Sequence, residues 1–104
     1  MKPYRVTLRP AAFADLQSIE AYIAEESSPE VAEGFVQAIA QRCFALDHFP
    51  LRGTPRDDLR PGARTIPFRR SVTILYAVEE REVAVLGIFY GGRDLEGLMA
   101  DRGS

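Results

Sequence analysis

Six arginines fall within residues 49–70 of this 104-residue chain, against two aspartates, so this segment has a net charge of +4. The flanking segments 1–48 and 71–104 each have a net charge of −3. A guanidinium group binds carboxylate or phosphate in a bidentate manner, which an ammonium group cannot match. The arginines therefore predict a patch for an acidic peptide or a nucleic acid. The alternative is a solvated loop whose arginines pair locally with aspartates.

Thiol and imidazole chemistry is sparse in this sequence. Cys43 is the only cysteine and His48 the only histidine, so we expect no internal disulfide and no metal site. Cys43 lies on an apolar helical stripe and is predicted to be a small core residue. His48 is predicted to meet the negative dipole end of a helix. We expect no cofactor.

The composition is that of an ordinary soluble protein, with 46% hydrophobic and 27% charged residues. The length predicts a single domain over residues 1–104. The net charge of −2 argues against binding of nucleic acid through the global charge. No signal peptide is visible, and no apolar stretch approaches the roughly 20 residues that cross a bilayer. We expect a cytoplasmic protein with no membrane partner.

The first half of the chain predicts one strand and two helices. Tyr4, Val6 and Leu8 alternate with polar residues, as in a strand. A helix then begins at Pro10 and runs to about Glu26, with an apolar stripe formed by Phe13, Leu16, Ile19, Tyr22 and Ile23. A second helix follows a serine N-cap and Pro29 and ends near residues 48–50, with a stripe formed by Phe35, Ile39, Cys43 and Leu46.

The second half predicts a loop and three strands. Residues 50–62 have no periodicity and read as a surface loop. Residues 64–68 predict a short strand, 72–78 and 83–90 an antiparallel hairpin, and a short helix follows near the C-terminus. The connection of about three residues between the helices makes them an antiparallel hairpin. We therefore predict an α+β fold in β-α-α-β-β-β order, with the helical hairpin packed on an antiparallel sheet.

Three stretches, residues 14–23, 49–62 and 88–94, occur in an order and spacing that resemble the ParE branch of the ParE/RelE toxin superfamily. The resemblance runs from about Tyr4 to Leu98. It implies a RelE/ParE-like fold and the toxin of a type II toxin-antitoxin system, of the kind called plasmid stabilisation proteins. It also implies a ParD-like antitoxin that wraps along the toxin in a hetero-oligomer such as a heterotetramer, with DNA contacted only indirectly through the antitoxin.

The resemblance leaves two modes of action open. ParE-like toxins typically act on DNA gyrase by stabilising its cleaved-DNA state, whereas RelE-like relatives cut mRNA on the ribosome. RNA cleavage to a cyclic phosphate needs a base, an acid and cations. Lys2 is the only lysine, His48 lies away from the strands, and an ordinary tyrosine, with a pKa of about 10, is a poor base at neutral pH. We therefore expect a gyrase inhibitor with no catalytic residue rather than an enzyme. A non-toxic binding module is a further alternative.

The resemblance also suggests contact residues. The target-binding candidates are Arg64, Arg69, Arg70, Tyr90 and Arg93. The antitoxin-binding candidates are apolar residues of the helices and arginines of the loop: Phe13, Leu16, Tyr22, Phe35, Arg52, Arg56 and Arg60. Many ParE-like chains have histidine where this chain has Tyr90, in a His-x-x-Arg arrangement, so the target contact at this position is in question. Arg93 has a structural alternative, in which it pairs with Asp94 or a strand-end carbonyl.

Overall fold

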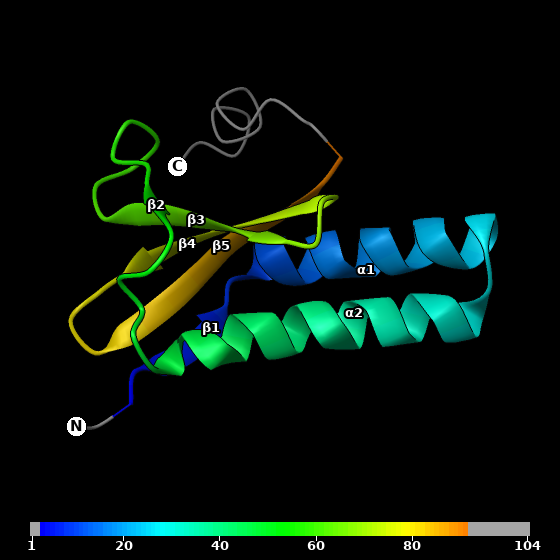
Figure 1. The fold of residues 1–104 in the computed structure, drawn as a ribbon, viewed down its shortest axis with the longest axis horizontal. Coiled ribbons are helices and arrows are strands. Elements are labelled where there is room, and N and C mark those ends of the chain that lie inside the picture. The colour runs from blue at the N-terminus through cyan, green and yellow to red at the C-terminus, as the bar shows by residue number, and fades with distance from the viewer. Residues whose placement is uncertain (1–2, 92–104) are drawn as a thin grey trace.

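The computed structural model describes residues 3–91 and has one helical layer packed on one sheet (Figure 1). The elements are β1 (Arg5–Leu8), α1 (Pro10–Glu26), α2 (Pro29–Phe44), the 3-10 helix η1 (Ala45–Asp47), β2 (Thr54–Pro55), β3 (Ala63–Phe68), β4 (Val72–Val78) and β5 (Glu82–Tyr90). The predicted α+β class, helical hairpin and strand hairpin are confirmed. The expected C-terminal helix lies outside the described residues. Neither α1 nor α2 combines the length and apolar character of a membrane-crossing helix.

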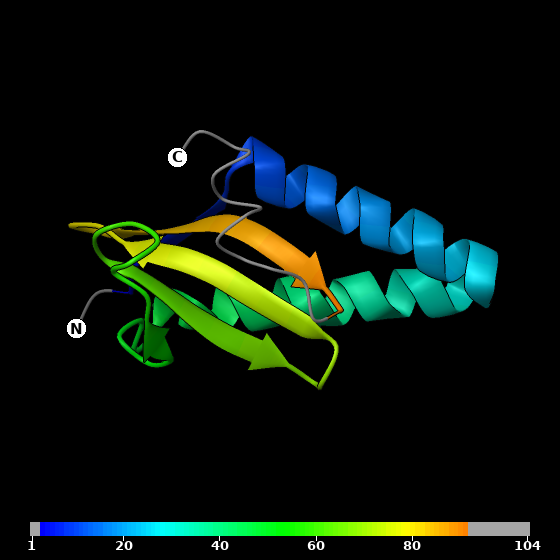
Figure 2. The same ribbon diagram turned by 90° about the horizontal axis from the view of Figure 1, so that it is seen from above.

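The sheet has the strand order β1-β5-β4-β3-β2 and is mixed, although we expected it to be antiparallel. β1 pairs in parallel with β5, with Val6 opposite Val83, and the other pairs are antiparallel. β4 occupies one edge of β5, so β1 pairs with the other edge. A parallel pair needs a long crossover connection, and the helical hairpin forms part of it. Figure 2 shows both helices beneath the same side of the twisted sheet.

The helix boundaries follow local signals in the sequence. Pro10 and Pro29 each stand in a first turn, where a missing N–H costs nothing. The backbone N–H of Val31 donates to Ser28 Oγ at 3.1 Å, which confirms the predicted serine cap. α2 ends at Phe44, before the predicted end, because the chain tightens there into η1.

Both faces of the sheet are apolar. The face toward the helices contributes Ile66, Phe68, Val72, Ile74, Tyr76, Val83, Val85 and Ile88 to the main core. The opposite face has a second cluster formed by Ala63, Leu75, Ala77, Ala84, Leu86 and Phe89. β5 is almost continuously apolar, and seven consecutive residues of it are buried, as expected of a strand covered on both faces.

The apolar stripe of α1 is narrower than the sequence predicted. Ile19 and Ile23 are buried, but Phe13 is 54% exposed and Tyr22 is 52% exposed. At 100° per residue, these two aromatic residues lie about 180° apart, on opposite borders of the buried stripe. A helix in a single layer packs only one sector of its surface on the sheet, so residues at both borders of that sector remain exposed to solvent.

The segment between η1 and β3 is more ordered than the predicted loop. Within it, β2 pairs antiparallel with β3, with Thr54 opposite Thr65. Gly53 makes this approach possible because its φ is +88° and a Cβ there would lie 2.6 Å from the carbonyl oxygen of Thr65. Two residues are too few for a periodic pattern, so the sequence carried no signal for β2.

Candidate functional site

Four aromatic rings from four elements meet at the end of the sheet where β3 and β5 finish. The ring centroids of Tyr22 and Tyr90 are 5.6 Å apart. Phe35 lies edge-on to Phe68 at 5.6 Å and to Tyr90 at 6.1 Å. Tilted and edge-to-face pairs of this kind are favourable beyond the area they bury. The rings therefore join α1, α2, β3 and β5 at this end.

Arg69 extends this group of rings into the turn between β3 and β4. Its guanidinium carbon lies 4.8 Å from the ring centroid of Phe68 and 5.5 Å from that of Phe35. The φ of Arg69, +54°, lets the chain reverse within three residues. The residue after β5 is linked to this turn, because the Gly91 N–H donates to the Ser71 carbonyl at 2.7 Å. We call Tyr22, Phe35, Phe68, Arg69 and Tyr90 the aromatic–arginine cluster. It presents a cation and aromatic surface together.

The target-binding candidates separate in the structure. Arg69 and Tyr90 belong to the aromatic–arginine cluster, and exposed Arg70 follows Arg69 in the same turn. Arg64 lies near the other end of β3, where its guanidinium donates to the carbonyls of Leu51 at 2.6 Å and Gly53 at 3.3 Å. Arg93 lies outside the described residues.

The antitoxin-binding candidates also divide into two groups. Tyr22 and Phe35 are in the aromatic–arginine cluster. Leu16 is half-buried against the main core, and Phe13 is exposed on the other border of α1.

The loop arginines of that set have partners within the chain. Arg56 forms a bidentate pair with Asp58, with both distances 3.0 Å, and holds the pKa of that carboxyl below its usual value. Arg60 reaches Glu79 at 3.4 Å. The local Arg–Asp pairing that the sequence left open is therefore present for Arg56.

Arg52 and Tyr76 hold the segment that follows η1. Arg52 donates to the carbonyls of His48 at 2.8 Å and Phe49 at 3.1 Å. The buried Tyr76 hydroxyl lies within hydrogen-bonding distance of the carbonyls of Pro50, at 2.9 Å, and Arg52. Burial raises the pKa of Tyr76, while the guanidinium groups of Arg64, Arg52 and Arg42 act to lower it. We call residues 48–53 the 48–53 loop.

Two important polar contacts were missed by the sequence analysis. Tyr76 lies within the predicted strand 72–78 and Asp15 within the first predicted helix, and neither was expected to make a specific contact. The Asp15 carboxylate accepts the backbone N–H of Ile88 at 2.8 Å, just beyond the β-bulge between β4 and β5. Asp15 thus accepts a backbone N–H at the edge of β5 beyond the point where β1 ends. No local pattern identifies either contact, because the partners lie 73 and about 25 residues away.

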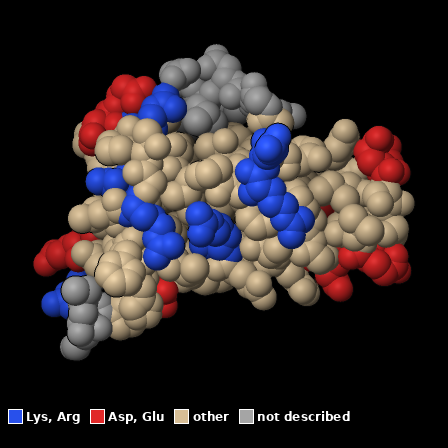
Figure 3. All heavy atoms as spheres, viewed as in Figure 1, with Lys and Arg blue, Asp and Glu red and all other residues tan. Residues whose placement is uncertain are grey.

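The charge is unevenly spread over the surface. Figure 3 shows basic side chains across the middle of one face and acidic side chains at the tip of the helical hairpin. That tip is where α1 ends and α2 begins, with Glu25, Glu26, Glu30 and Glu33. The acidic tip of the helical hairpin is therefore separated in space from the basic residues 49–70, whereas Glu79 of the acidic segment 71–104 lies beside Arg60.

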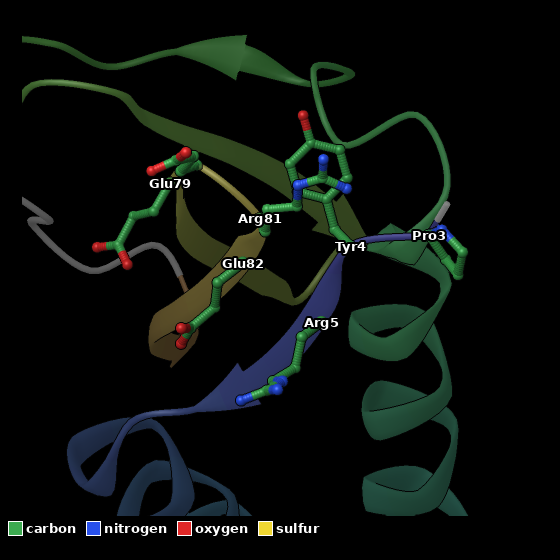
Figure 4. Close-up of a pocket in the computed structure, with 7 residues that line it drawn as sticks. Pro3, Tyr4, Arg5, Glu79, Arg81 and Glu82 are labelled. Carbon is green, nitrogen blue, oxygen red and sulfur yellow. The ribbon is translucent and has the colours of Figure 1, made fainter. Parts of the chain in front are cut away.

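A hollow lies at the opposite end of the sheet from the aromatic–arginine cluster, between residues 3–5 and the turn 79–82 (Figure 4). Two of its carboxylates, those of Glu79 and Glu82, have partners in the chain. Glu79 accepts from Arg9 and Arg60, both at 3.4 Å, and Glu82 accepts from Thr7 Oγ1 at 2.5 Å. These contacts tie Thr7, Arg9 and Arg60 to the β4–β5 turn, so the carboxylates of Glu79 and Glu82 act there as structural pairs.

The described residues do not form a group that could hold a metal ion. Cys43 is buried on α2, and burial raises the pKa of its thiol to about 12. A thiol with this pKa is protonated at neutral pH and is a poor nucleophile. The core position predicted for Cys43 is confirmed.

Comparisons with known proteins place this geometry in a family. The family described as the ParE toxin of the type II toxin-antitoxin system parDE matches residues 6–95. The solved chromosomal ParDE system from P. aeruginosa is similar, with a TM-score of 0.75 and 26% identity, covering 85% of this chain and 96% of that chain. The toxin-antitoxin complex RelBE2 from Mycobacterium tuberculosis shares the fold, with a TM-score of 0.59 and 20% identity, covering 85% of this chain and 98% of that chain. A comparison with curated proteins found no match.

The matched segment begins within β1 and extends through β5, so it includes both helices, the 48–53 loop and the aromatic–arginine cluster. The predicted resemblance is confirmed over the same part of the chain. The chain belongs to the ParE toxin family of type II toxin-antitoxin systems.

Proposed function

We propose that this toxin inhibits DNA gyrase by binding the enzyme and stabilising its cleaved-DNA state, and that a ParD-like antitoxin neutralises it. The observation that carries the proposal is the match to the ParE toxin of parDE over residues 6–95. The similarity to a solved ParDE system adds support. The toxin acts in this proposal as a ligand of a larger machine.

The aromatic–arginine cluster is the surface that we assign to the target. Arg69 is held over two rings, and Arg70 projects from the same short turn. Two guanidinium groups beside exposed aromatic surface suit an anionic partner, either carboxylates of gyrase or phosphates of its cleaved DNA. Because the rings come from four elements, the surface is rigid before binding, which lowers the entropic cost of association.

The acid–base groups of the chain favour binding over RNA cleavage. His48, the only histidine, follows η1, whereas Phe35 of the cluster lies in the first half of α2. Among the described residues, the polar groups of the cluster are the hydroxyls of Tyr22 and Tyr90 and the guanidinium group of Arg69. A base and an acid of matched pKa are what ribosome-dependent cleavage would require there.

The test compares two double variants of equal charge. Arg69→Ala with Arg70→Ala removes both cations from the cluster. Arg5→Ala with Arg81→Ala removes two exposed cations about 25 Å away, at the other end of β5. Purified toxin is assayed for inhibition of gyrase supercoiling and for accumulation of cleaved DNA. We expect the cluster variant to need at least tenfold more protein for half inhibition, and the control to match the wild type.

A parallel assay measures mRNA cleavage in translating ribosomes. We expect intact transcripts at toxin concentrations that stop gyrase. Cleaved transcripts together with unaffected gyrase would overturn the proposal in favour of a RelE-like activity. Equal potency of the two double variants on gyrase would remove the cluster from the contact surface.

A further inference from the structure

The 48–53 loop displays the most exposed large apolar side chains of the described residues. Phe49 is 74% exposed and Leu51 is 64% exposed. A single apolar residue at a surface is common and carries no meaning by itself. Here two of them stand two residues apart on a segment with an unusual backbone, so the pair needs a reason.

The backbone of Phe49 is unfavourable for its side chain. Its φ is +54°, in the left-handed region where glycine and asparagine are at ease and an aromatic residue is not. The side chain also gains little from burial, because most of it is in solvent. The folded state alone therefore gives no advantage to phenylalanine at this position, and strain of this kind points to a functional role.

The loop is held in place from both sides. Arg52 binds the carbonyls of His48 and Phe49, Tyr76 binds that of Pro50, and Arg64 binds that of Leu51. Four consecutive carbonyls are thus fixed by side chains from the loop itself, β3 and β4. A partner that docks on Phe49 and Leu51 meets a surface that is already ordered.

The surroundings of the loop are positively charged. The guanidinium groups of Arg42, Arg52 and Arg64 all act on Tyr76, the residue beneath the loop. The nearby carboxylate of Asp47 is engaged by His48 Nδ1 at 3.0 Å. A complementary partner needs apolar side chains flanked by carboxylates, which a peptide segment provides and a nucleic acid does not.

We propose that the 48–53 loop is a docking site for the antitoxin, in which Phe49 and Leu51 insert between apolar side chains of an antitoxin segment whose Asp or Glu residues face Arg42 and Arg52. This inference rests on the antitoxin named in the proposed function. A partner that stays bound suits the loop better than a transient target, since it keeps this apolar surface out of water. The target surface lies instead at the aromatic–arginine cluster.

The experiment uses the full chain and the ParD-like antitoxin of the proposed function. Phe49→Asn with Leu51→Ser removes both apolar side chains, and Val31→Ser is the control, because Val31 is 53% exposed at the other end of α2. Titration calorimetry gives the Kd of each toxin for the antitoxin. We expect the double variant to bind at least 30-fold more weakly and the control to remain within twofold of the wild type. Phe49→Asn alone should raise the Tm by about 2–5 °C, because asparagine tolerates this backbone.

The outcomes separate the two proposals. An unchanged Kd for the double variant overturns the docking site. Loss of gyrase inhibition with unchanged antitoxin affinity also overturns it, because the loop would then face the target. Weaker binding to a DNA or RNA duplex with unchanged antitoxin affinity would overturn it in favour of a nucleic-acid contact. A wild-type toxin that binds the antitoxin but leaves gyrase untouched removes the gyrase proposal and leaves this one standing.

Discussion

The aromatic–arginine cluster and the 48–53 loop use arginine in opposite ways. In the cluster, Arg69 lies over aromatic rings, and Arg70 beside it is exposed. In the loop, Arg52 and Arg64 donate to backbone carbonyls and display apolar side chains instead. The same residue type therefore forms a contact surface in one region and a scaffold in the other. The difference depends on whether unpaired carbonyls lie within reach of the guanidinium group.

If the 48–53 loop is held rigidly by its contacts, the stability of the protein should depend most on Gly53, where the loop approaches β3 most closely. Gly53→Ala would add a Cβ 2.6 Å from the Thr65 carbonyl oxygen and 2.7 Å from Ile66 Cγ2, at a φ of +88°. We expect a loss of about 2–4 kcal/mol in the free energy of unfolding, measured by urea denaturation. Gly34→Ala is the matched control, because a Cβ there meets nothing within 4 Å on α2. It should instead stabilise by about 0.5–1 kcal/mol. Equal changes in the free energy of unfolding for the two substitutions would mean that the loop accommodates a Cβ at residue 53 without cost.

Tyr76→Phe tests the other side of the same scaffold. It removes the hydroxyl that serves the carbonyls of Pro50 and Arg52 while keeping the ring in the core. We expect a loss of about 1–3 kcal/mol in the free energy of unfolding, because the Pro50 and Arg52 carbonyls lose the one hydroxyl proton that they share. Faster hydrogen exchange confined to residues 49–53 should accompany it. A stability equal to the wild type would show that the loop does not depend on this hydroxyl.

The same hydroxyl gives the loop a pH dependence. Burial raises the pKa of Tyr76 in the folded chain, so the unfolded chain releases this proton first as the pH rises. Stability from this group is therefore complete below about pH 10, the ordinary pKa of tyrosine, and is lost at higher pH. Between pH 9 and 11, the free energy of unfolding from urea denaturation should decrease more steeply with pH for the wild type than for Tyr76→Phe. Parallel pH profiles would contradict this assignment.

The smallest stability effects are expected from the arginines themselves, and they should differ between the two regions. Arg64→Ala leaves the carbonyls of Leu51 and Gly53 without their donor and should cost about 1–2 kcal/mol. Arg69→Ala removes a surface cation–π contact and should cost about 0.5–1 kcal/mol. Thermal melts measure both. The reverse order of stability loss would erase the distinction between scaffold and contact surface.

Sequence reasoning succeeded where the signals were local. These signals involve only neighbouring residues: the alternation in β4, the apolar run of β5, the prolines at 10 and 29, and the Ser28 cap. It was wrong about the pairing of β1, because the partner and direction of a strand depend on pairing with a distant segment and on the crossover between them, and residues near β1 do not specify these. It missed β2 and the role of Tyr76 because both depend on contacts between distant segments.

The sequence by itself determined the elements, their order, the family and the charge separation between the helices and the central arginine segment. Tertiary structure decided what the arginines in contact with other residues do: two hold the 48–53 loop, others form ion pairs, and Arg69 lies over the rings of Phe35 and Phe68. The physical reason is that periodicity and capping are properties of neighbouring residues. The partner of a guanidinium group, by contrast, is whichever carbonyl, carboxylate or ring the folded chain brings within about 3–6 Å of it.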